Sequence, residues 1–132
     1  MQAEKYLFSL RNQGSKYGIE RMQVLVRALD HPERRYPVNH VAGTNGKGSV
    51  CAMLEAALRK AGLKVGMLTS PHLVRLGERL QVNRNPISDE EISGFVDYLQ
   101  PVAERLAKND PEDHPSFFEL ITAMGFLLFA RE

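Results

Sequence analysis

VAGTNGKGSV, residues 41–50, resembles a phosphate-binding loop but departs from the usual sequence pattern. The usual phosphate loop has a glycine five residues before a Gly-Lys pair, and a Ser or Thr directly after the lysine. Here Val41 stands in place of the first glycine, and Gly48 stands in place of the hydroxyl residue. The stretch fails the strict pattern at two positions, so its function has to be judged from its chemistry and its flanks.

The residue types of this stretch suit the binding of a phosphate group. Gly43, Gly46 and Gly48 let the backbone bend closely around an anion, and Lys47 adds a positive charge. Ser49 supplies a hydroxyl one residue later than usual. The alternative is a glycine-rich turn that binds nothing. The combination favours a nucleotide site, formed by Thr44, Asn45, Gly46, Lys47, Gly48 and Ser49.

The flanks of the loop predict an α/β fold. The run at 38–43 is of strand type, a helix with an apolar face is expected from Lys47 to Ala61, and Val65 to Thr69 reads as a second buried strand. Strand, glycine turn, helix and strand make a βαβ unit with parallel strands. Lys47 and Ser70 each follow one of these strands, so both are expected at the carboxyl edge of the sheet, where α/β proteins bind ligands.

Further elements are predicted along the rest of the chain. Apolar spacing indicates a helix over 18–30, and residues 78–82 read as an edge strand. Ser88 with Glu91 forms a capping box that opens another helix, which Pro101 should kink or end. A final apolar helix runs from Ser116 to Arg131. No strand follows it, so we expect the chain to be the first piece of a longer protein.

Composition excludes several functional classes. The 132 residues are enough for one domain, with 43% hydrophobic and 25% charged residues and a net charge of +1. That balance gives no field that would attract nucleic acid or anionic lipid. The single cysteine, Cys51, excludes an internal disulfide, and no apolar run is long enough to span a membrane. These features fit a cytoplasmic protein.

Three motifs together resemble one enzyme family. HVAGTNGKGSV (40–50), TSPHLVRLGERLQVN (69–83) and FFELITAMGFLLF (117–129) look like the folylpolyglutamate synthase/dihydrofolate synthase family, which is related to the Mur ligases. The resemblance implies a P-loop NTPase-like fold of the Mur ligase central domain type, with three layers and a mostly parallel sheet that is incomplete here. Residues 1–132 would form the N-terminal part of the ATP-binding domain, without the C-terminal glutamate-binding domain.

The resemblance also implies an activity. Such a protein would be an ATP-dependent ligase of folate biosynthesis that adds L-glutamate to folates and/or dihydropteroate through an acyl phosphate. ATP and Mg²⁺ would be its cofactors, Lys47 its catalytic residue, and Ser70 and Glu119 its metal ligands. We expect a monomer that acts on these small molecules and binds neither nucleic acid nor membrane, and we expect the isolated 132 residues to be inactive.

Alternatives stay open at this point. Ser116 and Glu119 also form a capping box, and spacing alone favours that role for Glu119 over metal binding. A Mur-type ligase would share the ATP domain, although the inserted Gly48 argues against it. A non-catalytic nucleotide-binding module is a further possibility for the fragment. A GTPase is disfavoured because the chain lacks an Asn-Lys-x-Asp motif.

Overall fold

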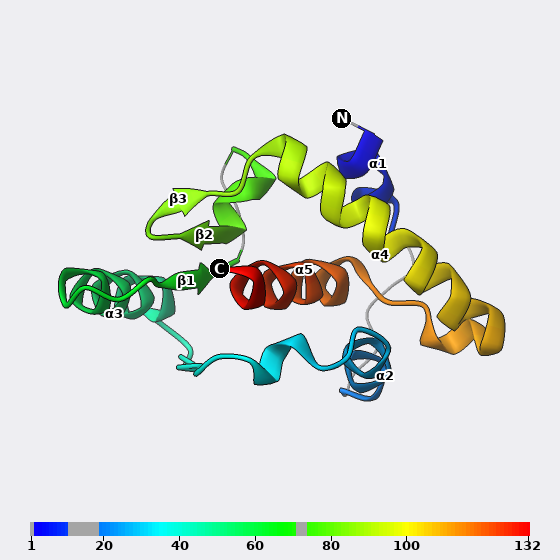
Figure 1. Cartoon of the computed structure of the whole chain (residues 1–132), viewed down its shortest axis with the longest axis horizontal. Coiled ribbons are helices and arrows are strands. Elements are labelled where there is room, and N and C mark those ends of the chain that lie inside the picture. The colour runs from blue at the N-terminus through cyan, green and yellow to red at the C-terminus, as the bar shows by residue number, and fades with distance from the viewer. Residues whose placement is uncertain (1, 11–18, 71–73) are drawn as a thin grey trace.

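The chain folds into a group of helices beside a small antiparallel sheet (Figure 1). The structure is a computed structural model, and it describes residues 2–10, 19–70 and 74–132. The helices are α1 (Gln2–Ser9), α2 (Glu20–Ala28), α3 (Lys47–Lys60), α4 (Asp89–Asn109) and α5 (Phe117–Arg131), and the strands are β1 (Gly66–Leu68), β2 (Leu80–Val82) and β3 (Asn85–Pro86). Short 3-10 turns lie at Pro32–Arg34, Leu76–Arg79 and Pro111–Asp113.

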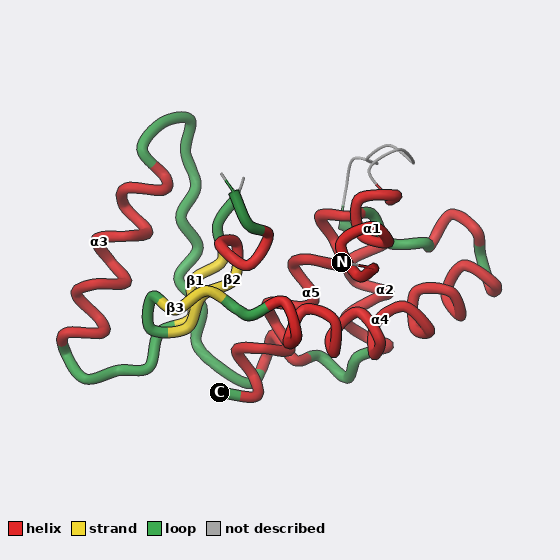
Figure 2. The backbone as a smooth tube through the Cα atoms, turned by 90° about the horizontal axis from the view of Figure 1, so that it is seen from above, coloured by secondary structure: helices red, strands yellow, loops and turns green. Residues whose placement is uncertain are grey.

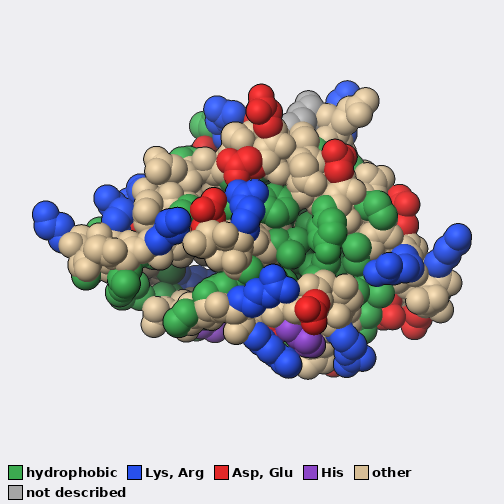
Figure 3. Space-filling view, in the orientation of Figure 1, with side chains coloured by type: hydrophobic (Ala, Val, Ile, Leu, Met, Phe, Trp, Pro, Cys, Tyr) green, Lys and Arg blue, Asp and Glu red, His purple; other side chains and the backbone are tan. Residues whose placement is uncertain are grey.

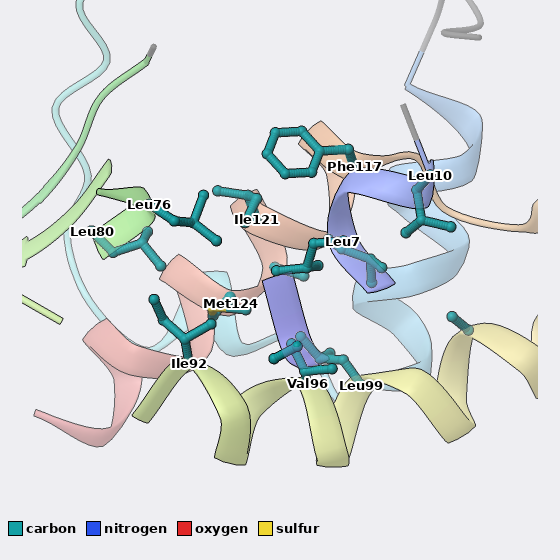
Figure 4. Close-up of a cluster of buried hydrophobic side chains, with 14 of the residues drawn as sticks. Leu7, Leu10, Leu76, Leu80, Ile92, Val96, Leu99, Phe117, Ile121 and Met124 are labelled. Atoms are coloured by element: carbon teal, nitrogen blue, oxygen red, sulfur yellow. The ribbon is translucent and has the colours of Figure 1, made fainter. Parts of the chain in front are cut away.

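The hydrophobic core lies where α1, α2 and α4 pack around α5 (Figure 4). Helix α4 contributes a stripe of buried residues at helical spacing, which includes Ile92, Val96 and Leu99. Helix α5 is buried on several sides, with Leu120 and Met124 almost fully enclosed. Burying each such side chain contributes about 1.5–3 kcal/mol. The two long helices predicted from the sequence therefore form the centre of the domain.

Helix α4 continues past the proline that was expected to kink or end it. Ser88 caps its first turn by accepting a hydrogen bond from the Glu91 N–H at 3.1 Å, as predicted. The helix then runs through Pro101 to Asn109 as one element. A proline inside a helix costs about 3 kcal/mol, and the burial of Val102 and Ala103 directly after it offsets that cost.

The sheet is antiparallel throughout the described residues. Strand β1 pairs with β2, and β2 pairs with β3 through a two-residue turn at Asn83 and Arg84, both with positive φ. That backbone fits the type I′ turn typical of tight hairpins. The Asn83 side chain accepts a hydrogen bond from the Val65 N–H at 2.8 Å, which holds the turn beside β1. The predicted strands at 65–69 and 78–82 are thus confirmed as β1 and β2. The expectation that the second of them is an edge strand is wrong, because β2 pairs on both sides and lies in the middle of the described sheet.

The parallel strand pair predicted around the glycine loop is wrong for the described residues. Residues 38–43 form no strand, so the expected βαβ unit lacks its first member. A parallel strand is stable when a sheet pairs with it and layers cover both its faces. Val38 is 61% exposed, and no described segment pairs with its neighbours. The apolar face of α3 is uncovered in the same way, with Val50 46% and Leu54 36% exposed.

The outer surface mixes charges of both signs. In Figure 3, acidic and basic side chains are interspersed over the visible face, with hydrophobic side chains between them. This distribution agrees with the net charge of +1. Within the described ranges, no helix is long and apolar enough to cross a membrane.

Candidate functional site

The glycine loop ends in an uncapped helix N-terminus. Gly46 precedes α3 with φ of 76°, a left-handed conformation that glycine adopts without strain, and no side chain caps the helix. The N–H groups of the first turn of an α-helix have no partner inside the helix, and they carry about half a positive charge. Such an end binds anions. The loop therefore has the backbone geometry expected of a phosphate site.

All six predicted loop residues lie together and face solvent. Thr44 to Ser49 are exposed, and Lys47 is the first residue of α3. Gly46 and Gly48 both have open space where a Cβ atom would stand, with no other group within 4 Å. A phosphate could therefore approach the backbone closely at these positions, and Lys47 could place its ammonium group beside it.

Ser70 follows β1 and is also exposed. Helix α3 and strand β1 run in opposite directions next to each other, so the start of α3 and the end of β1 face the same side of the molecule (Figure 2). The sequence placed Lys47 and Ser70 at one edge by assuming parallel strands. The structure brings them to the same side through the turn of the chain between α3 and β1.

The start of α5 lies on this side as well. Strand β1 runs antiparallel to α5, since Gly66 lies against Phe129 and Leu68 lies near Gly125. One residue before Ser70, the Thr69 N–H donates to the Arg79 carbonyl at 3.0 Å. The Arg79 guanidinium in turn lies 5.1 Å from the centre of the Phe117 ring, at the first residue of α5.

Glu119 forms the capping box that its spacing allows. Its Oε1 accepts a hydrogen bond from the Ser116 N–H at 2.9 Å, and its own N–H donates to the Ser116 hydroxyl at 3.2 Å. The same Oε1 lies 3.2 Å from Nε of Arg21, with both side chains mostly buried. Arg21 also donates to the His114 carbonyl at 3.3 Å. The carboxylate thus joins α2 to the start of α5.

This environment bears on the proposed metal ligand. Oε1 of Glu119 is engaged by the cap and by Arg21, which leaves Oε2 for a cation, next to a guanidinium that would repel it. The described residues contain no group of three or more His, Cys, Asp or Glu side chains that could hold a metal ion. The structure therefore gives Glu119 the role that spacing favours, and its role as a metal ligand stays a prediction.

Arg21 pairs with Glu119, a contact that the sequence did not predict. Its partner Glu119 lies almost a hundred residues away, so no local pattern links them. In the sequence, Arg21 is a charged residue next to Met22, at the edge of an apolar helical stripe. That position is too common among charged residues to indicate a particular partner.

The chain is similar in sequence to curated proteins named as folylpolyglutamate synthases. It is 44% identical over 118 residues to the dihydrofolate synthase/folylpolyglutamate synthase of Bacillus subtilis, a match over 89% of this chain and 27% of that protein. It is 36% identical over 111 residues to the folylpolyglutamate synthase of Lacticaseibacillus casei, over 84% of this chain and 26% of that protein. The chain thus spans about a quarter of the length of these relatives. No protein-family model matches it.

Solved structures agree with the sequence matches. The folylpolyglutamate synthase of Thermotoga maritima superimposes with a TM-score of 0.90 at 38% identity, over 99% of this chain and 31% of that one. A complex of folylpolyglutamate synthase with AMPPCP and folate gives 0.88 at 30% identity, over 98% of this chain and 31% of that one. The predicted fold class is confirmed by these overlaps, because nearly every residue of the chain follows the backbone of those enzymes.

Proposed function

Because this chain belongs to the folylpolyglutamate synthase/dihydrofolate synthase family, we propose that it supplies the nucleotide-binding part of an ATP-dependent ligase. The ligase adds L-glutamate to folates and/or dihydropteroate. Residues 1–132 would form the first part of the ATP-binding domain of a longer cytoplasmic, monomeric enzyme. Family structures named for complexes with AMPPCP, and with AMPPCP and folate, support this choice of ligands.

The observation that carries the proposal is the exposed, uncapped start of α3. Gly46 turns the backbone so that the free N–H groups of the first turn face solvent, and Lys47 stands at the same point. Phosphoryl transfer needs positioning and positive charge more than a side-chain nucleophile. At about 4 Å and a surface-like dielectric, one lysine–phosphate pair contributes on the order of 4 kcal/mol before desolvation.

The reaction proceeds in two steps. An oxygen of the substrate carboxylate attacks the γ-phosphorus of ATP, the bond to the bridging oxygen breaks, and ADP leaves with that oxygen. The product is an acyl phosphate. The amine of glutamate then attacks the acyl carbon, phosphate leaves from the tetrahedral intermediate, and the amine releases a proton as the amide forms. Lys47 and the backbone N–H groups stabilise the charge that develops on the transferred phosphoryl oxygens.

Magnesium fits one of the two predicted ligands better than the other. Hydroxyl and carboxylate oxygens suit this hard cation. Ser70 is exposed and comes shortly after β1, whose end faces the same side of the molecule as the start of α3. The ion would neutralise phosphate charge when bound. We propose Ser70 as a ligand, and expect Ser70→Ala to raise the Mg²⁺ concentration needed for half-maximal ATP binding. An unchanged Mg²⁺ requirement would remove Ser70 from the site.

Oxygen-18 transfer tests the proposed chemistry. Full-length enzyme is given ATP, glutamate and a pteroate or folate whose attacking carboxylate carries oxygen-18. The proposal predicts one labelled oxygen in the released phosphate, because the carboxylate oxygen that bonds phosphorus leaves with it. Phosphate without the label would refute the acyl phosphate. A mass spectrum of the product should show one added glutamyl residue, which separates this ligase from a Mur-type enzyme with another amino acid.

A further inference from the structure

Three charged side chains join α3 to the hairpin of β2 and β3, and we call them the α3 latch: Glu55, Arg59 and Arg84. The Glu55 carboxylate lies 3.0 Å from Nε of Arg59, within the same helix. Arg84 approaches from the hairpin turn, and its Nε donates to Oε1 of Glu55 at 3.0 Å. A second guanidinium nitrogen of Arg84 donates to the Ala52 carbonyl at 2.9 Å. Arg84 therefore contacts both a side chain and the backbone of α3.

The carboxylate of the latch is shielded from solvent. The Glu55 side chain is 1% exposed, while the side chains of Arg59 and Arg84 that cover it are 44% and 42% exposed. Burial alone would raise the pKa of Glu55, but hydrogen bonds and charges from Arg59 and Arg84 outweigh it and hold that pKa below its usual value. The latch is therefore charged at neutral pH.

The hairpin that carries Arg84 is itself fixed to β1. Asn83 exchanges hydrogen bonds with Val65, through its side chain at 2.8 Å and through its N–H at 2.7 Å. Within the described residues, Arg84 joins α3 to the sheet from the side opposite its exposed Val50 and Leu54. Arg84 therefore links the sheet to α3, the helix that begins at the glycine loop. We call this link the tie.

The distance along α3 makes this tie relevant to the loop. Glu55 lies eight residues after Lys47, which is about 12 Å along an α-helix. A tilt of about 5° around the latch would move the first turn by about 1 Å, and misplacement by about 1 Å can cost about 10²-fold in activity.

We propose that Arg84 is a positioning residue for the nucleotide loop: it holds α3 so that the first turn faces the phosphates of ATP. This inference rests on the proposed function. Arg84 touches no part of the loop itself. Its effect passes through Glu55 and Ala52 to the axis of the helix.

Replacing Arg84 with glycine tests the proposal without damaging the turn. Asn-Gly is the preferred dipeptide of a type I′ turn, so Arg84→Gly keeps the hairpin, and Glu55 keeps its partner Arg59. In the full-length enzyme, calorimetry should show the dissociation constant of ATP–Mg²⁺ rising about tenfold, at a temperature well below the thermal midpoint of the variant, so that the loss is measured on folded protein. The matched control, Arg59→Ala, removes an arginine from the same carboxylate but leaves the tie, and should bind as the wild type does. Arg84→Lys should lie between wild type and Arg84→Gly.

The outcomes separate this inference from the proposed function. Equal ATP affinity in wild type and Arg84→Gly overturns the inference alone. An equal loss of ATP affinity in Arg59→Ala and Arg84→Gly also overturns the inference, because the charge near Glu55 rather than the tie would then explain the loss. A wild-type enzyme that binds ATP but joins no glutamate to a folate or to dihydropteroate overturns the proposed activity and leaves the latch intact. A wild type that fails to bind ATP contradicts both.

Discussion

Replacing Lys47 with alanine should abolish ligation and leave the fold unchanged. Lys47 is exposed and begins α3, and it makes no contact with the core. Surface substitutions of this kind change the free energy of unfolding by within about 0.5 kcal/mol. Its charge, in contrast, would face the phosphates. A lysine–phosphate pair at about 4 Å contributes on the order of 4 kcal/mol, which corresponds to about a thousandfold in kcat/KM for ATP.

The assay compares two lysines of the same helix. Lys60 is exposed at the opposite end of α3, far along the helix from the loop. In full-length enzyme, kcat/KM for ATP and the thermal midpoint are measured for wild type, Lys47→Ala and Lys60→Ala. We expect a loss of about a thousandfold for Lys47→Ala alone, at an unchanged midpoint. Activity of Lys47→Ala within a few-fold of Lys60→Ala would refute the reasoning.

Three other predictions concern single positions. Glu119→Gln keeps a side chain that can cap α5 but loses the charge beside Arg21, so unfolding should become about 1–3 kcal/mol easier. A raised Mg²⁺ requirement in this variant would support the predicted role of Glu119 as a metal ligand, and an unchanged requirement would contradict it. Gly77→Ala puts a Cβ onto the Ile87 carbonyl and should lower stability by about 1–3 kcal/mol, whereas Gly94→Ala, with open space around it, should raise it by about 0.5–1 kcal/mol; equal thermal midpoints would contradict this. The pKa of Glu55 is lower in the folded chain than its ordinary value. The carboxylate therefore stabilises the fold fully above about pH 4.3, and this contribution disappears as the pH falls through the folded pKa. Between those two pH values, the thermal midpoint of Glu55→Gln should depend less on pH than that of the wild type.

Local patterns predicted helices α2 to α5, whereas α1 was not predicted. The apolar spacing over 18–30 and after Ser88 gave amphipathic helices whose buried faces are those of α2 and α4. The capping box at Ser116 and Glu119 forms as its spacing indicates. These features depend on residues three or four apart, which a single sequence displays directly.

The strand around the glycine loop depends on non-local partners, and there the prediction failed. Residues 38–43 have the composition of a buried strand, but composition supplies neither a neighbouring strand nor a covering layer. The carboxyl edge of a parallel sheet, where Lys47 and Ser70 were expected, is therefore absent from the described residues. The start of α3 and the end of β1 still face one side of the molecule, because a helix followed by a returning strand brings those two ends together.

The contacts of Arg21 and Arg84 could not be read from the sequence at all. Each joins residues that are distant along the chain: Arg21 pairs with Glu119 and Arg84 with Glu55. Charged residues are common on helices and turns, and only the folded backbone shows which of them meet. Beside Glu119, the structure adds the guanidinium of Arg21, which spacing could not indicate.

The most direct test of the central claim is phosphate release by the full-length enzyme. ATP and L-glutamate are supplied with dihydropteroate in one series and tetrahydrofolate in another, and each component is omitted in turn. We expect phosphate release that requires ATP, glutamate and at least one of the two acceptors, and that is lost in Lys47→Ala. No glutamate-dependent release with either acceptor would contradict it.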